Sequence, residues 1–265
     1  MSSKIFMTRF RIFRRKGSGT RTVLGVVGLI VLLCIWQACV QFHVVPPGLL
    51  PAPTELWPAW RSEVAGGYWQ HAVCDSLEHY STGLVIGSVL GALAGLGCGA
   101  VPLADALTAG IVRFLRPIPG LAWVPFAILW FGLNTAGATF VIAISVFWIN
   151  FYAAYGAVKS VDPELYEVAA AFGHSGFIAR MRYVIIPASS PGLLAGLRTG
   201  LGQGWMSVVA AELFGVPGIG ARMMQASSLL ATDIVVVYMI TMAGLYALTD
   251  FLFSFVRARL LRWQG

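Results

Sequence analysis

The chain has 265 residues, of which 58% are hydrophobic and 11% are charged. Soluble globular domains carry about 25% charged residues, so this composition excludes a soluble domain, and the length suffices for five or six membrane spans. The net charge of +7 does not indicate nucleic-acid binding, because the basic residues gather at the chain ends and beside apolar runs. The four cysteines contain no Cys-x-x-Cys pair and predict no zinc or redox site.

The N-terminal part begins with a basic tail and continues into an apolar run. Residues 1–21 carry no acidic residue, and we expect a cytoplasmic tail. Residues 22–42 are uncharged and predict a first transmembrane helix, since the run is too long for the apolar region of a signal peptide. Residues 43–79 are rich in proline and predict an extracytoplasmic connection. Within it, His71 and His79 have no third ligand at helical spacing and are expected to be surface or interface histidines.

Residues 80–256 are predicted to form the membrane core. The segment 80–101 has a glycine at every fourth position from 83 to 99, a spacing that lets helix backbones approach closely in lipid. Because an α-helix has 3.6 residues per turn, this row drifts around the helix, and we expect it to serve more than one neighbour. Three prolines between residues 117 and 125 predict a broken span. Further spans are expected at about 137–157, 192–211 and 234–256, followed by a cytoplasmic tail at 257–265.

A polar interruption at residues 158–190 separates two of these spans. Asp162 is a good N-cap residue and Pro163 suits the first helical position. Gly173 is placed to end this helix. Ser175 can cap a second helix, which we expect to stop at Pro187.

The same stretch resembles the EAA loop of the permease subunits of bacterial ABC importers. Glu167, Ala169 and Gly173 match the motif. Val168 replaces its first alanine, Ile-Pro replaces its final Leu-Pro, and the gap from Gly173 to Pro187 is one residue longer than in the family. The resemblance implies an all-α membrane protein of about six transmembrane helices with the type I ABC importer transmembrane-domain fold. In such proteins this loop is the helix that couples the permease to the ATPase.

The broken span and the segment after the loop narrow the resemblance to one branch. Residues 116–125 read Arg-Pro-Ile-Pro-Gly-Leu-Ala-Trp-Val-Pro, and Gly-Leu-Arg198 and Ala-Ala-Glu212 follow later. These motifs resemble permeases for taurine, aliphatic sulfonates and nitrate. The resemblance implies a small anionic solute, a second copy of the chain in a homodimer, two ATPase subunits and an extracytoplasmic solute-binding protein. It also implies a bacterial inner-membrane location.

The candidate site residues fall into two groups. The resemblance implies the following coupling residues: Glu164, Glu167, Ala169, Ala170, Gly173 and Pro187. The candidates for the translocation path are Arg198, Gln203, Ser207 and Trp123. Arg198 either serves an anionic solute or extends towards the cytoplasmic headgroups, because it lies near the start of its span. Gln203 and Ser207 are one helical turn apart and share a face.

The distribution of basic residues tests the topology. With six spans and a cytoplasmic N-terminus, only Arg61 and Arg222 lie outside and Arg198 lies within a span. All other basic residues, including Arg113 and Arg116, are then cytoplasmic, in agreement with the positive-inside rule. Both termini and residues 158–190 are therefore expected in the cytoplasm.

The chain also lacks certain motifs. It has no Gly-x-x-x-x-Gly-Lys-Ser/Thr sequence and no nucleophile–base constellation. We therefore expect a non-catalytic subunit without a cofactor, with ATP and magnesium on the partner ATPase. The alternative is a stand-alone secondary transporter driven by an ion gradient. That class predicts ionisable residues near span midpoints and internal repeats, whereas the sequence offers only Arg198 and Asp250, both nearer span ends.

Overall fold

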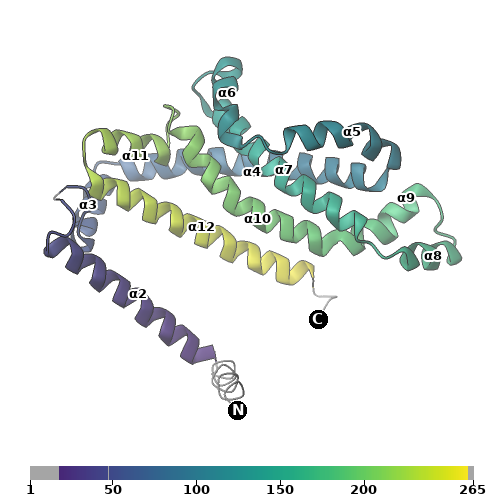
Figure 1. Ribbon diagram of the computed structural model, residues 1–265, viewed down its shortest axis with the longest axis horizontal. Coiled ribbons are helices and arrows are strands. Elements are labelled where there is room, and N and C mark those ends of the chain that lie inside the picture. The colour runs from purple at the N-terminus through teal and green to yellow at the C-terminus, as the bar shows by residue number, and fades with distance from the viewer. Residues whose placement is uncertain (1–17, 47, 262–265) are drawn as a thin grey trace, which may run out of the picture.

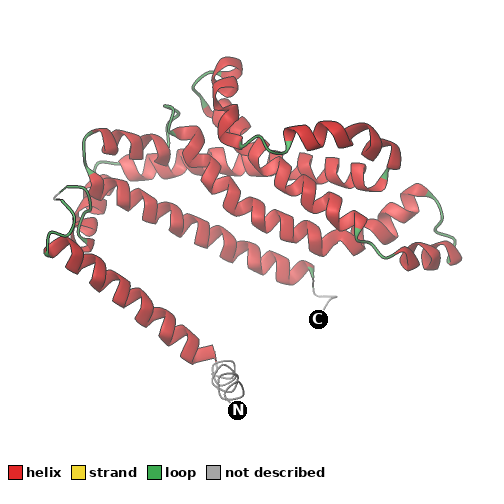
Figure 2. Cartoon of the chain, in the orientation of Figure 1, coloured by secondary structure: helices red, strands yellow, loops and turns green. Residues whose placement is uncertain are grey.

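The computed structural model describes residues 18–46 and 48–261, and no strand occurs in this part of the chain (Figure 2). Most of the predicted basic tail and residues 262–265 lie outside the described residues. The helices are α2 (Ser18–Gln41), α3 (Pro53–Ala65), α4 (Tyr68–Ala100), α5 (Pro102–Leu115), the 3₁₀ turn η2 (Gly120–Trp123), α6 (Val124–Phe131), α7 (Thr135–Lys159), α8 (Pro163–Ala171), α9 (Phe177–Arg180), the π-helical turn η3 (Met181–Ile185), α10 (Ile186–Glu212), α11 (Ile219–Ser228) and α12 (Thr232–Leu260).

Four long helices form the body of the molecule. α7 packs along α4 on one side and along α10 on the other, and α12 packs against α3, α10 and α11. α8 and α9 lie at one end of the bundle, which we name the α8 end, while α3 and α11 lie at the opposite end, the α11 end (Figure 1). α2 diverges from the bundle and contacts it at α3.

Membrane-spanning helices account for most of the described chain. By length and composition, four helices can cross a bilayer: residues 23–41, α4, α7 and α12. The pair α5 and η2–α6, bent by 89°, brings the number to five if it is counted as one span. The predicted number of about six also requires α10, which is 27 residues long but is not apolar enough to be counted. Many of its residues are small or polar because they contact neighbouring helices rather than lipid.

The glycine row of α4 faces a single neighbour, which corrects the expectation of several. Methyl groups built at glycines 83, 87, 91, 95 and 99 would all meet residues of α7, from Thr139 to Val158. A row of residues four apart is inclined to its helix axis by about 26°. Helix α7 crosses α4 along this inclined row, so the drift of the glycines does not carry them away from it.

The helices around the start of the predicted core have the following bounds. α4 begins at Tyr68 and runs without interruption to Ala100, through the predicted boundary between the connection and the core at residues 79 and 80. Arg113 lies in the last turn of α5 and Arg116 directly follows it. Both arginines therefore lie at the bend between α5 and η2, because α5 folds back along α4 directly after Ala100.

Candidate functional site

Helix α8 has the predicted beginning and end. The backbone N–H of Glu164 donates to Asp162 Oδ1 at 2.9 Å, which confirms the N-cap. Gly173 has φ +84°, a conformation that favours glycine. The N–H of His174 donates to the carbonyl of Ala169 at 2.8 Å, and that of Gly173 to Ala170 at 3.0 Å. These two bonds form a Schellman motif, which reverses the chain directly after α8.

The second half of the loop differs from the prediction. Gly176, not Ser175, precedes the next helix, and Pro187 does not stop it. The helix continues from α9 through the π turn η3 into α10, where Pro187 is the second residue. A proline has no N–H and its ring clashes with the carbonyl four residues earlier. The wider π turn before it relieves this conflict and accommodates one additional residue, which matches the longer gap between Gly173 and Pro187.

One side of α8 is anchored on the start of α10. Ala169 is 8% exposed and packs with Val161 and Val184, and Tyr166 and Ala188 cover this cluster. Ala169 is a small residue at the place where α8 packs on η3. The anchored side gives α8 a fixed position relative to α10.

The other side of α8 is apolar and exposed. Leu165, Val168 and Phe172 project outwards, and Phe172 is 78% exposed. They border a groove of about 540 Å³ whose opposite side contains Tyr183 and Pro187. We name these five residues the α8 surface. Four of the predicted coupling residues are exposed around this surface: Glu164, Glu167, Ala170 and Gly173.

The four translocation-path candidates do not share one environment. Arg198 donates two hydrogen bonds to Asp250 of α12, at 2.7 and 2.8 Å, so its charge is paired with a carboxylate. Gln203 is half-buried and Ser207 is buried, one turn apart on α10 as predicted. Trp123 is half-buried and packs against Phe126 and Phe140. Its indole N–H has no acceptor among the described residues.

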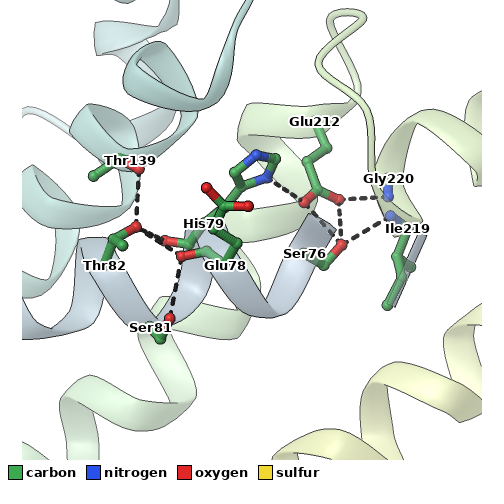
Figure 3. A network of polar contacts seen from close by, with 9 residues as sticks. All are labelled: Ser76, Glu78, His79, Ser81, Thr82, Thr139, Glu212, Ile219 and Gly220. Atoms are coloured by element: carbon green, nitrogen blue, oxygen red, sulfur yellow. Dashed lines mark hydrogen bonds and ion pairs between the residues drawn. The ribbon is translucent and has the colours of Figure 1, made fainter. Parts of the chain in front are cut away.

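A buried polar network near the α11 end was not predicted (Figure 3). The Glu212 side chain is 0% exposed and accepts hydrogen bonds from Ser76, from His79 Nδ1 at 3.0 Å, and from the N–H of Gly220 at 2.8 Å. The N–H of Ile219 donates to Ser76 Oγ at 2.8 Å. His79 is 2% exposed, so of the two expected places, surface or interface, it does not occupy the surface and lies between helices. The carboxylate therefore joins α4, α10 and the start of α11.

The sequence contains part of the signal for this network. Ser76 and His79 are three residues apart and share a helix face, and Glu212 closes an apolar helix. The sequence does not indicate that these residues contact Glu212, because 133 residues separate His79 from Glu212.

A second network fixes the outer segments to each other. Arg222 of α11 donates to both carboxylate oxygens of Glu63 of α3, at 2.8 and 3.0 Å, and the Tyr238 hydroxyl donates to Glu63 at 2.8 Å. Burial raises the pKa of Glu63, but the hydrogen bonds from Arg222 and Tyr238 outweigh it and hold this pKa below its usual value. The Arg222 guanidinium also lies 4.2 Å from the ring centroid of Tyr68.

Solved structures with the same fold confirm the architecture. The inward-facing methionine ABC transporter MetNI aligns with a TM-score of 0.59 at 19% identity, over 73% of this chain and 94% of that chain. An amino acid ABC transporter crystallised with histidines aligns with a TM-score of 0.59 at 18% identity, over 77% and 97% of the two chains. The fold is therefore that of the transmembrane subunits of type I ABC importers.

Sequence comparison identifies relatives along most of the chain. The taurine transport system permease protein TauC of Escherichia coli (strain K12) is 30% identical, over 92% of this chain and 91% of the relative. A putative aliphatic sulfonates transport permease protein, SsuC, of the same organism is 31% identical over 88% and 89%. The bicarbonate transport system permease protein CmpB of Synechocystis sp. is 28% identical over 78% and 76%.

A family model covers the core of the chain. Residues 87–262 match the model described as binding-protein-dependent transport system inner membrane component. Members of this family are membrane permeases, which act with an ATPase and a solute-binding protein rather than as catalysts. This chain therefore belongs to the binding-protein-dependent transport system inner membrane components, the permease subunits of ABC transporters.

Proposed function

We propose that this permease imports a small organic anion of the sulfonate class. Relatives at about 30% identity over most of the chain are taurine and aliphatic sulfonate permeases, which supports this solute class. We further propose that two copies of the chain assemble with two ATPase subunits and an extracytoplasmic binding protein. ATP and magnesium then belong to the ATPase, because the chain lacks a phosphate-binding loop sequence.

The α8 surface is the observation that carries the coupling role. Leu165, Val168 and Phe172 are exposed together on a helix whose other side is anchored on α10. Apolar residues gathered at the end of a bundle fit the groove of a partner protein. The bundle end with α8 also carries Arg180 and Arg182, and Arg257 and Arg259 end α12. By the positive-inside rule, we propose that this end and both termini face the cytoplasm.

The continuity of the chain from α8 to α10 provides the mechanical link. Closure of the ATPase dimer on ATP would move α8, and the packing of Ala169 on Val184 would pass the movement to η3 and α10. α10 contacts α4, α7 and α12, so its displacement would change the whole core. The solute path would then open alternately to the two sides of the membrane.

The substitution Gly173→Arg tests this proposal. A Cβ at Gly173 would meet nothing within 4 Å, so the new side chain has open space beside the α8 surface, and the strain from the positive φ is shared by the control below. We expect the variant in the membrane in normal amount, with the ATPase subunit lost on co-purification and uptake reduced at least about tenfold, equivalent to 1.4 kcal/mol. The matched control is Gly48→Arg at the α11 end. Gly48 also has a positive φ, and a Cβ built there would meet no heavy atom within 4 Å. This control should retain the ATPase.

The outcomes separate the two classes of transporter. Normal uptake by Gly173→Arg at normal protein level would contradict the role of α8. A chain that purifies without any ATPase, yet still supports uptake, would establish a secondary transporter driven by an ion gradient. A recovered binding protein would identify the solute by the ligand it holds.

A further inference from the structure

Arg113 and Arg116 lie at the bend of the broken span. Contacts made by the residues before and after them show how far along the bundle they lie. Near the start of α5, Asp105 accepts from Lys159, the last residue of α7, at 2.8 Å. Just past the arginines, Gly120 lies against Ser145, near the middle of α7. Arg113 and Arg116 therefore lie between the α8 end and the middle of the bundle. Ionisable residues at such depth are rare and face the protein interior or a water-filled cavity.

Helix α5 has two distinct faces. Its exposed face is a stripe of large apolar side chains: Leu103, Leu107, Ile111 and Phe114. In a membrane protein such a stripe fits lipid or another apolar surface. Arg116 shares the opposite face with Asp105 and Val112, because separations of seven and four residues are close to whole helical turns. Arg116 is thus turned away from the apolar stripe, whereas Arg113 lies beside it, and both side chains are exposed in the single chain.

Both arginines line a groove between α5 and α7. It has a volume of about 210 Å³, and its walls include Thr108, Tyr152 and Tyr155. The Arg116 guanidinium lies 4.5 Å from the ring centroid of Tyr152. With about 30 Å³ for each water in the liquid, the groove has room for about seven waters. This size fits only a small solute.

The groove has an excess of positive charge. The carboxylate of Asp105 binds Lys159 and accepts from the Tyr155 hydroxyl at 2.9 Å, so it does not neutralise the arginines. Within residues 18–46 and 48–261, no carboxylate forms an ion pair with Arg113 or Arg116. A guanidinium at membrane depth is costly without a counter-charge. It also presents a rigid fork of donors that matches sulfonate and phosphate oxygens.

We propose that Arg113 and Arg116 form a binding site for the sulfonate group of the transported solute, on its route through the broken span. The assignment of a sulfonate to this site rests on the solute class given under the proposed function. The two guanidinium groups line the groove that would hold the sulfonate head, and Tyr152 borders the same groove. A phosphate headgroup of an anionic lipid has the same chemistry, and the experiment separates the two sources.

Cys98 provides a reporter inside this groove. It is half-buried, and its Sγ lies 3.4 Å from Thr108 Oγ1. The full chain, with Cys34, Cys39 and Cys74 replaced by alanine, is placed in nanodiscs of neutral phosphatidylcholine. Its Cys98 is labelled with two methanethiosulfonate reagents, one carrying a sulfonate and one a trimethylammonium group. The ratio of the two rates reports the local potential, since any change in thiol reactivity affects both reagents.

We expect the anionic reagent to react faster. Charge focused in a cleft raises the local concentration of an opposite ion by about tenfold or more, so Arg113→Gln with Arg116→Gln should lower the rate ratio at least about tenfold. Free ethanesulfonate should protect Cys98 in the parent chain and not in this variant. The double lysine variant should retain most of the ratio, and the control Arg61→Gln, on α3, should leave it unchanged.

Three results would overturn the site. The first is an unchanged rate ratio in the double glutamine variant. The second is an absence of protection by ethanesulfonate. The third is protection by phosphatidylglycerol in the nanodisc without protection by ethanesulfonate, which would assign the groove to a lipid headgroup. Labelling needs no ATPase, so these results are independent of co-purification in the Gly173→Arg experiment.

Discussion

The contact between α4 and α7 requires that the glycines of α4 carry a hydrogen atom in place of a side chain. The substitution Gly91→Ala tests this requirement. A Cβ at Gly91 would lie 3.1 Å from the Cα and carbonyl carbon of Phe147 and closer still to its carbonyl oxygen, whereas ordinary contacts begin at 3.4 Å. Because these atoms belong to the backbone, no side chain can rotate away. The two helices would have to move apart by about 1 Å, and such a gap forfeits a quarter to a half of each dispersion contact along the interface.

The magnitude follows from a comparison with Gly97 on the same helix. A Cβ at Gly97 would meet nothing within 4 Å, so Gly97→Ala should be neutral or should stabilise the helix by about 0.5–1 kcal/mol. Both substitutions gain this helix propensity, and the difference between them isolates the cost of overpacking. We expect Gly91→Ala to be less stable than Gly97→Ala by about 1–3 kcal/mol.

Thermal unfolding of the purified chain in one detergent, followed by size-exclusion chromatography, measures the difference. For a chain of this size, each kcal/mol corresponds to a shift of about 2–4 °C in the midpoint. Equal midpoints for the two variants would refute the inference that α4 and α7 are in backbone contact at Gly91.

Three further predictions concern the polar networks. Glu212→Gln places an amide donor among the N–H and O–H groups that the carboxylate accepts, and it should lower the stability by about 1–3 kcal/mol in the same thermal assay; an unchanged midpoint would contradict the network. Asp250→Asn removes the partner of Arg198 and should reduce the yield of monodisperse protein, while exchange of the two residues should restore it; no recovery in the exchanged variant would show that the ion pair is not the cause. The pKa of Glu63 is lowered in the folded state, so its bonds to Arg222 stabilise the fold above the unfolded pKa of about 4.3 and are lost as pH falls through the folded value. Midpoints measured from pH 7 down to pH 3 should therefore fall less steeply in Glu63→Gln than in the parent chain, and parallel curves would contradict this.

The sequence by itself determined the class of protein and the local structure of α8. Composition excluded a soluble domain, and the motif from Glu167 to Gly173 pointed to the family that the comparison then showed. Asp162 and Gly173 act within one or two turns of the chain, so their effects are readable from neighbouring residues. The solute class and the coupling residues stay predictions until the experiments above are done.

Only the tertiary structure decided how distant segments combine. Pro187 alone predicts a helix stop, but the π turn η3 absorbs it because α8 and η3 pack together through Ala169 and Val184. On an isolated helix the glycine row winds slowly around the axis. Because α7 crosses α4 along this inclined row, all five glycines lie in one interface. His79 and Glu212 find each other across the fold, since contacts between buried polar groups depend on which helices become neighbours and not on their separation in the chain.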